Sequence, residues 1–386
     1  MRRLAAILTA AAVLAGLSAS PATAVSQYMK LFQEPGDYEA RFPDIVKLDD
    51  GRLMAVWYRA TGHTGPEGTV QLSFGTQSGS AWTWVTPYPA LANPSTMLHK
   101  DMRDPKLGKM RDGAVVLTFF VPSDGVYYSV WKPGWNNFTD PVKLVVPGIP
   151  GGALAEHGGV LALDDQGASV SQVLIPVYND TGAWFVRATW RPVSDPRLLL
   201  ADAFQLAANA PVADGFTDTF TEPSFVQVAG TVIAAVRHEQ NKGSTSNGQP
   251  VKIMKWNPYT FTGTGSYYDV QWLPVFASSH HLLKVSGPNN QDRVLFTFGD
   301  KGVALRPTYG ILIQNPLARW PETGLKKVAI YNSGSSDQAN PSSVEVSGGV
   351  YFTLAYNAKP KSATEGNGMS PNGGSLWVMR STQDEY

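Results

Sequence analysis

The sequence predicts an all-β protein, a six-bladed β-propeller with four antiparallel strands in each blade. Three observations predict this fold class. A strand–turn–strand unit recurs six times along the chain, turn formers and aromatics are abundant (37 Gly, 28 Pro and 11% aromatic residues), and no segment of useful length has the apolar period of a helix. Together these features indicate many short strands joined by turns.

Each copy of the repeat begins with a polar or proline-containing segment, continues as an apolar strand, turns at a glycine and returns as a second apolar strand. Four copies are clear and two are weaker; the clear ones span 41–57, 103–119, 222–237 and 340–356, and the weaker ones span 156–178 and 279–298. Their anchor residues recur every 53 to 65 positions. This near-constant spacing is typical of propeller blades, and two stacked β-sandwiches are the alternative architecture.

Further strand candidates between the copies complete the blades. Val70–Phe74, Trp184–Trp190 and Tyr309–Ile313 bring the number to about four strands per repeat. We also expect Tyr28–Phe32 to pair beside Ser375–Met379 in the last blade, because joining the two ends of the chain removes the open edges of the ring.

The first 24 residues read as a secretory signal peptide. Arg2 and Arg3 precede an apolar run that is too short to span a membrane, and Ala22-Thr23-Ala24 matches a small-residue cleavage site. The predicted organisation is therefore a signal peptide over 1–24 and a single propeller domain over 25–386. We expect a secreted protein that does not insert into membranes.

Composition and charge exclude several classes of function. The absence of cysteine excludes disulfide scaffolds, thiolate metal sites and cysteine nucleophiles. Equal numbers of basic and acidic side chains, 31 of each, give no general attraction to nucleic acid. The six histidines lack metal-ligand spacing, so we expect no metal and no cofactor, and we expect a monomer.

The starts of the six copies are unusually polar for positions that lead into a blade core. They are Arg41, Arg103-Asp104, Glu156-His157, Glu222, Ser279-His280 and Asn340, and Arg237 ends the fourth copy where the others carry an aromatic residue. In a propeller these starts converge on one mouth around the central channel. A buried charge is costly unless it is paired, so these residues form either a functional site or a ring of structural ion pairs.

These residues resemble the sialidase superfamily of propeller exo-glycosidases with Asp-box-like repeats. The resemblance rests on Arg41-Phe-Pro, Arg103-Asp-Pro, the spacing from Glu222-Pro-Ser to Arg237, and Pro341-Ser-Ser-Val. It extends in order along nearly the whole of 25–386. The Asp-box itself is degraded, and the segment from Thr76 to Trp82 keeps only its glycine and tryptophan.

The resemblance implies roles for individual residues. Arg41, Arg237 and Arg306 match the three arginines that hold the substrate carboxylate, a task that suits the planar guanidinium group. Glu222 matches the glutamate that activates a nucleophilic tyrosine. Arg103 and His157 lie at neighbouring strand starts and are further candidates for substrate binding.

The position that matches the nucleophilic tyrosine holds Asn340, and an amide cannot form the covalent intermediate. Tyr309 or Tyr331 could supply a phenol from another loop, or Glu222 could act directly on a sugar. For the general acid, the loop after the first hairpin offers Glu67 instead of the aspartate of the family, with Asp104 and His63 as alternatives.

The predicted function is a secreted, sialidase-like exo-glycoside hydrolase that acts on a terminal, acidic sugar of a glycan. Glu222, Glu67 and Asp104 are the candidate catalytic residues. Two alternatives stay open: a propeller that binds glycans without cleaving them, and a propeller hydrolase for a neutral sugar such as arabinose.

Overall fold

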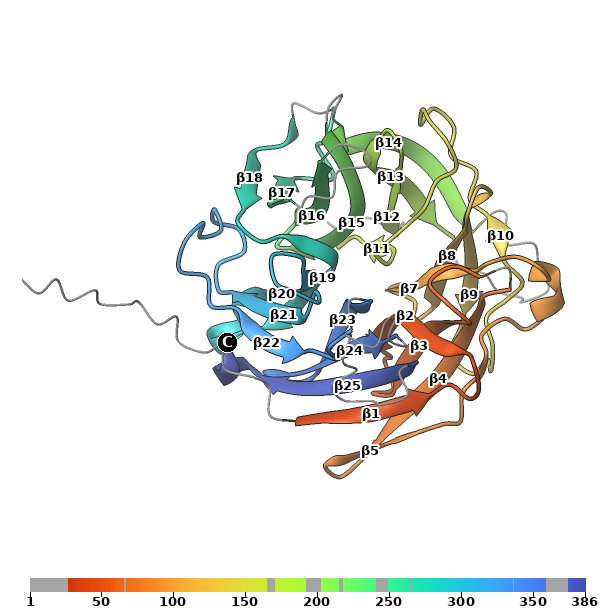
Figure 1. Cartoon of the computed structure of the whole chain (residues 1–386). Coiled ribbons are helices and arrows are strands. Elements are labelled where there is room, and N and C mark those ends of the chain that lie inside the picture. Colours follow the sequence, from red (N-terminus) through yellow and green to blue (C-terminus); the bar gives the residue numbers. More distant parts are fainter. Residues whose placement is uncertain are drawn as a thin grey trace, which may run out of the picture.

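Six antiparallel sheets surround a central axis, as Figure 1 shows, and they form a six-bladed β-propeller. The computed structural model describes residues 27–65, 67–164, 171–191, 203–214, 218–240, 249–263, 266–335, 337–358 and 374–386. The predicted signal peptide lies outside these ranges. Each predicted repeat forms the two inner strands of one blade, or leads into them, so the predicted fold class is confirmed.

Blades 1 to 3 come from the first half of the chain. Blade 1 consists of β2 (Glu39–Lys47), β3 (Leu53–Ala60), β4 (Thr69–Ser78) and β5 (Ala81–Trp84), with β6 (Tyr88–Pro89) also paired to β4. Blade 2 consists of β7 (Arg103–Lys109), β8 (Val115–Val121), β9 (Gly125–Trp131) and β10 (Val142–Lys143). Blade 3 consists of β11 (Leu161–Ala162), β12 (Gln172–Asn179), β13 (Gly182–Trp190) and β14 (Phe204–Asp214).

Blades 4 to 6 come from the second half. Blade 4 consists of β15 (Asp218–Val228), β16 (Thr231–Gln240), β17 (Val251–Trp256) and β18 (Asp269–Leu273). Blade 5 consists of β19 (Ala277–Ser286), β20 (Asp292–Asp300), β21 (Thr308–Ile313) and β22 (Val328–Tyr331). Blade 6 consists of β23 (Gln338–Ser347), β24 (Val350–Asn357), β25 (Ser375–Thr382) and β1 (Gln27–Gln33).

The ring closes by pairing the first described strand with the last. β1 lies antiparallel to β25, with Tyr28 opposite Met379, and Figure 1 shows the two strands side by side at the edge of blade 6. The predicted closure is therefore confirmed. β1 thus supplies the outer strand of blade 6 and covers the edge of β25.

The apolar core is divided among the spaces between neighbouring blades. Each space holds its own cluster of buried side chains, for example one between blades 1 and 2 that contains Trp131 and one between blades 6 and 1 that contains Trp57. Both tryptophans are almost fully buried, so large apolar side chains from the strands fill the space between neighbouring blades.

The described residues contain no α-helix, and their helical turns are short 3₁₀ segments such as η1 (Pro94–Met97), η4 (Pro288–Asn290) and η5 (Gln383–Glu385). None of the described helical turns has the length or apolar character needed to cross a membrane. Within the same residues there is no group of three or more histidine, aspartate or glutamate side chains placed to hold a metal ion.

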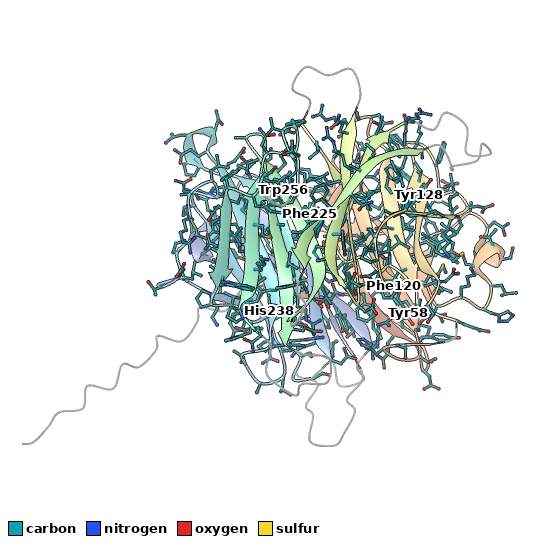
Figure 2. All side chains as sticks on the ribbon, turned by 90° about the horizontal axis from the view of Figure 1, so that it is seen from above. Tyr58, Phe120, Tyr128, Phe225, His238 and Trp256 are labelled. Atoms are coloured by element: carbon teal, nitrogen blue, oxygen red, sulfur yellow. The ribbon has the colours of Figure 1, made fainter. Side chains whose placement is uncertain are left out.

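The inner strands β2, β7, β15, β19 and β23 all begin on one side of the ring, which we call the mouth face. Tyr58 pairs with Arg41 at the end of β3, and Phe120 pairs with Arg103 at the end of β8. Figure 2 shows Tyr58, Phe120 and His238 together at the lower side of the edge-on view, which is this face. The polar strand starts therefore gather at one end of the central channel.

Candidate functional site

A repeated backbone distortion shapes the mouth. Phe42, Asp104, Glu222 and Asn340 have φ between 49° and 55°, a left-handed conformation that costs a non-glycine residue roughly 1–3 kcal/mol. Each precedes a proline and lies where the pairing register of its strand shifts. Such bulges reorient side chains, and here they occur where the inner strands begin.

Asp104 and Asn340 meet across the channel, although blade 1 lies between their blades. Asn340 donates from Nδ2 to Asp104 Oδ1 at 2.9 Å, and Lys106 Nζ lies 2.9 Å from Asn340 Oδ1 and 3.0 Å from Asp104 Oδ1. Burial would raise the pKa of Asp104, but the charge of Lys106 and the hydrogen bond from His157 lower it far below its usual range. Asp104 is therefore a carboxylate, and it is not a proton donor at neutral pH.

His157 connects this cluster to blade 5. The backbone N–H of His280 donates to His157 Nε2 at 3.1 Å, so the ring proton resides on Nδ1, which faces Asp104 Oδ2 at 3.4 Å. Burial lowers the pKa of His280 to about 3. His280 is therefore neutral, and its ring lies 5.7 Å from that of His157.

Glu222 lies in the same region and is held on both carboxylate oxygens. Oε1 forms an ion pair with Arg237, and Oε2 accepts the backbone N–H of Ser279 at 2.7 Å. Burial would raise the pKa of Glu222, but the charge of Arg237 and the hydrogen bond from the Ser279 N–H lower it to about 2. Its side chain is 12% exposed, so an ionised carboxylate borders the mouth.

Arg41 and Arg306 converge on one aspartate. Arg41 forms ion pairs with Glu39 and Asp337, and Arg306 Nη2 lies 3.7 Å from the second oxygen of Asp337. The Tyr356 hydroxyl also donates to Asp337, at 2.6 Å. Burial would raise the pKa of Asp337, but the hydrogen bond from His63 and the charge of Arg41 lower it strongly.

The three arginines therefore belong to one network. Arg306 donates to the hydroxyl of Ser278 at 3.3 Å, and the adjacent Ser279 binds Glu222, which pairs with Arg237. Arg237 also pairs with Glu239. The three guanidinium groups thus face four carboxylates, which are Glu39, Asp337, Glu222 and Glu239. Their positive charge is neutralised within the protein.

Other predicted site residues lie farther from this network. Glu67 lies on the loop between β3 and β4, is 65% exposed and bonds to His99 at 3.0 Å. Tyr309 lies on the third strand of blade 5, packed on Phe298 and under Lys327. Tyr331 is buried against Trp377. Neither phenol has a contact with Glu222.

Several residues of the site escaped the sequence analysis. Glu39 and Asp337 each lie just before a predicted strand start. Glu39 pairs with Arg41 within one strand, whereas the pairing of Asp337 with Arg41 depends on the contact between blades 6 and 1. Tyr178 on β12 lies near Glu222 and Asp104: burial, followed by the charges of these two carboxylates, raises its pKa well above the usual value. The sequence signals for Glu39 and Asp337 were a carboxylate two positions before Arg41 and another three positions before Asn340.

Comparison with solved structures identifies proteins of the same fold. A protein of unknown function from Dyadobacter fermentans matches with a TM-score of 0.67 and 14% identity, over 94% of this chain and 100% of the other. The α-L-arabinanase of Penicillium chrysogenum, complexed with arabinobiose, has a TM-score of 0.59 and 13% identity, over 93% and 98% of the two chains.

The Trypanosoma rangeli sialidase in complex with the inhibitor DANA has a TM-score of 0.58 and 13% identity, over 93% of this chain and 58% of the sialidase. No protein-family model matches the sequence, and no curated protein matches it. The structural similarity extends over nearly the whole chain, whereas the sequences have diverged widely. The chain therefore has a six-bladed β-propeller fold that sialidases and an arabinanase also have.

Proposed function

We propose that this protein is an exo-acting glycoside hydrolase that removes a neutral terminal sugar, such as arabinose, from a glycan. The observation that carries the proposal is Glu222, an ionised carboxylate held at the mouth by Arg237 and the Ser279 N–H. An oriented carboxylate stabilises the positive charge that develops on the sugar ring, and it can attack the anomeric carbon directly. The fold shared with an arabinanase and with sialidases agrees with this role.

A neutral sugar fits the mouth better than an acidic one. Arg41 is paired with Glu39 and Asp337, and Arg237 is paired with Glu222 and Glu239. A sugar carboxylate would have to compete with these groups for the guanidinium donors, at the cost of leaving a buried carboxylate without its partner. The pairing therefore argues against the carboxylate clamp that the sequence suggests.

Glu67 is the candidate general acid. Asp104 is an unsuitable donor because its pKa lies far below the usual range. Glu67 lies on the loop between β3 and β4, where 65% of its side chain is exposed to solvent. In the reaction, Glu67 would donate its proton to the glycosidic oxygen while Glu222 faces the anomeric carbon.

The alternative is a propeller that binds glycans without cleaving them. Asn340 favours it, since this amide is 2% exposed and is tied to Asp104 and Lys106 in a closed set of hydrogen bonds. We further propose that the protein acts outside the cell, because residues 1–24 have the pattern of a signal peptide, and that it is a monomer. Detection of the shortened chain in the culture medium would test export.

The decisive experiment measures sugar release from a panel of arabinosides, sialosides and other glycans. We expect cleavage of a neutral glycoside, with kcat lowered about 10²- to 10⁴-fold in Glu222→Gln and in Glu67→Gln. Glu322→Gln, at an exposed position of blade 5, is the matched control and should retain full activity. Binding without turnover would instead support the non-catalytic alternative, and cleavage of sialosides alone would contradict the neutral substrate.

A further inference from the structure

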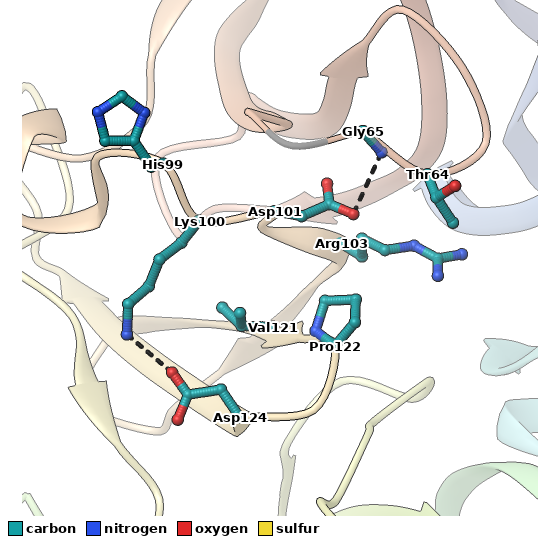
Figure 3. A pocket seen from close by; sticks show the side chains of 9 residues that line it. All are labelled: Thr64, Gly65, His99, Lys100, Asp101, Arg103, Val121, Pro122 and Asp124. Carbon is teal, nitrogen blue, oxygen red and sulfur yellow. Dashed lines mark hydrogen bonds and ion pairs between the residues drawn. The ribbon is translucent and has the colours of Figure 1, made fainter.

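A cavity opens on the mouth face between blades 1 and 2. Its volume is about 530 Å³, within the range that takes a small organic ligand. It is lined by Thr64, Gly65, His99, Lys100, Asp101, Arg103, Val121, Pro122 and Asp124 (Figure 3). Phe42 lies between this cavity and the network of Arg41 and Asp337, since its ring packs on both Tyr58 and Tyr356 and faces Arg103.

The two carboxylates of the cavity already have partners. Asp124 binds Lys100 and Lys143, each at 2.7 Å, and the Tyr127 hydroxyl at 2.8 Å. Asp101 accepts the Tyr58 hydroxyl at 2.5 Å and the backbone N–H of Gly65 at 3.3 Å. Figure 3 shows the Lys100–Asp124 pair on the side of the cavity away from the guanidinium of Arg103.

Arg103 differs from the other three arginines predicted to bind substrate. In the described part of the chain it forms no ion pair, and its Nε is buried without a hydrogen-bond partner. Its guanidinium carbon lies 5.4 Å from the ring centre of Phe120 and 5.8 Å from that of Phe42. In Figure 3 the side chain extends between Thr64 and Pro122.

A guanidinium group fixed beside two rings has lost water and conformational freedom, and it gains most from a planar anion that accepts two parallel hydrogen bonds. The nearby acidic side chains have other partners. We propose that this cavity is a subsite for an acidic sugar unit, whose carboxylate pairs with Arg103. The cavity lies next to the mouth because two neighbouring residues of β7 belong to the two places. Arg103 lines the cavity, and Asp104 lies in the mouth.

The proposal rests on the proposed function for the identity of the ligand as a sugar. It deepens that function by naming the substrate class: a glycan in which a uronic acid lies beside the neutral terminal sugar. The neutral unit would occupy the mouth at Glu222, and the acidic unit would occupy the cavity. The cavity would recognise the charge of the substrate, and the mouth, in other blades, would cleave the glycosidic bond.

The test is calorimetric binding of methyl β-D-glucuronide, methyl β-D-glucoside and glucose 6-sulfate to the full chain at low salt. We expect the glucuronide to bind at least about tenfold more tightly than the glucoside. Arg103→Gln should abolish that preference, and Arg103→Lys should retain only part of it. Arg52→Gln, which removes an exposed arginine paired with Asp50, is the matched control and should leave it intact.

Equal binding of glucuronide and glucoside by the unaltered protein would overturn the subsite, and so would an unchanged preference in both Arg103 variants. Tighter binding of the sulfate ester than of the glucuronide would overturn its assignment to a carboxylate. Because binding is measured without cleavage, an Arg103-dependent preference for the glucuronide would stand even if no glycan were hydrolysed. Absence of hydrolysis would then count against the proposed function alone.

Discussion

Glu156 is a fully buried carboxyl group beside the mouth, and it makes the stability of the fold depend on pH. Its carboxyl oxygens accept no hydrogen bond from another described residue. Burial, followed by the charge of Asp104, raises its pKa well above the usual value. The folded protein therefore keeps a proton on Glu156 that the unfolded chain releases.

The sign of the effect follows from this difference in proton binding. Between the ordinary pKa of a glutamate, about 4.5, and the raised value, the folded state binds more protons, so the free energy of unfolding falls as pH rises. Glu156→Gln replaces the titrating carboxyl group with an amide. The free energy of unfolding of this variant should therefore exceed that of the unaltered chain by an amount that grows from pH 5 to pH 8. Each unit of pKa shift corresponds to about 1.4 kcal/mol.

Urea unfolding at several pH values measures this difference. The exposed Glu322→Gln variant is the control and should follow the unaltered protein at every pH. A difference between Glu156→Gln and the unaltered protein that stayed constant over the whole range would show that Glu156 does not titrate as described.

At this scale the sequence analysis identified most of the charged residues but not their pairing. Arg41, Glu222 and Arg237 stand out because they interrupt apolar repeats. Their partners Glu39 and Asp337 flank the strand starts and look like ordinary polar loop residues. Asp337 meets Arg41 because blade 6 lies against blade 1 in the closed ring. The spacing of the repeats does not show which side chains face each other across that contact.

A hydrogen-bond pattern recurs at three inner strands and links each of these three to the next blade. Asp44, Ser224 and Ser342 directly follow the proline of their bulge. Asp44 accepts the N–H of Leu107 at 2.5 Å, Ser224 that of Leu282 at 3.3 Å, and Ser342 that of Ile45 at 3.2 Å. A polar residue after the proline thus satisfies a buried backbone donor of the neighbouring blade.

This pattern yields a prediction for Ser224, which is 2% exposed. Ser224→Ala should lower the free energy of unfolding by about 1–3 kcal/mol, because the buried N–H of Leu282 loses its acceptor. Ser95→Ala, at an exposed position where the hydroxyl contacts only its own loop, should cost close to nothing. Chemical unfolding of the two variants checks the pattern, and equal stability would refute it.

The strands themselves were largely predictable. Alternating apolar residues around a glycine turn produce β2–β3, β15–β16 and β23–β24 where the repeats were identified. Blade 3 is the exception, since its inner strand β11 has only two residues. A Cβ on Gly159 would lie 2.2 Å from the Leu107 carbonyl, so this segment packs too closely on β7 for an ordinary side chain.

The closed ring is the property of the whole molecule on which the mouth depends. β1 pairs along the outer edge of β25, and it comes from the first part of the described chain. Removal of residues 1–33 should lower the melting temperature by several degrees, while removal of 1–24 should leave it unchanged. Equal melting temperatures of the two truncated chains would show that closure by β1 contributes little to stability.

The most direct test of the account is a crystal structure of Glu222→Gln with a glycan that the unaltered protein cleaves. We predict that the terminal sugar lies in the mouth, with its anomeric carbon beside position 222 and within reach of Arg237 and His157. A glycan bound on the opposite face of the ring, or along the outer strands, would contradict the assignment of the site.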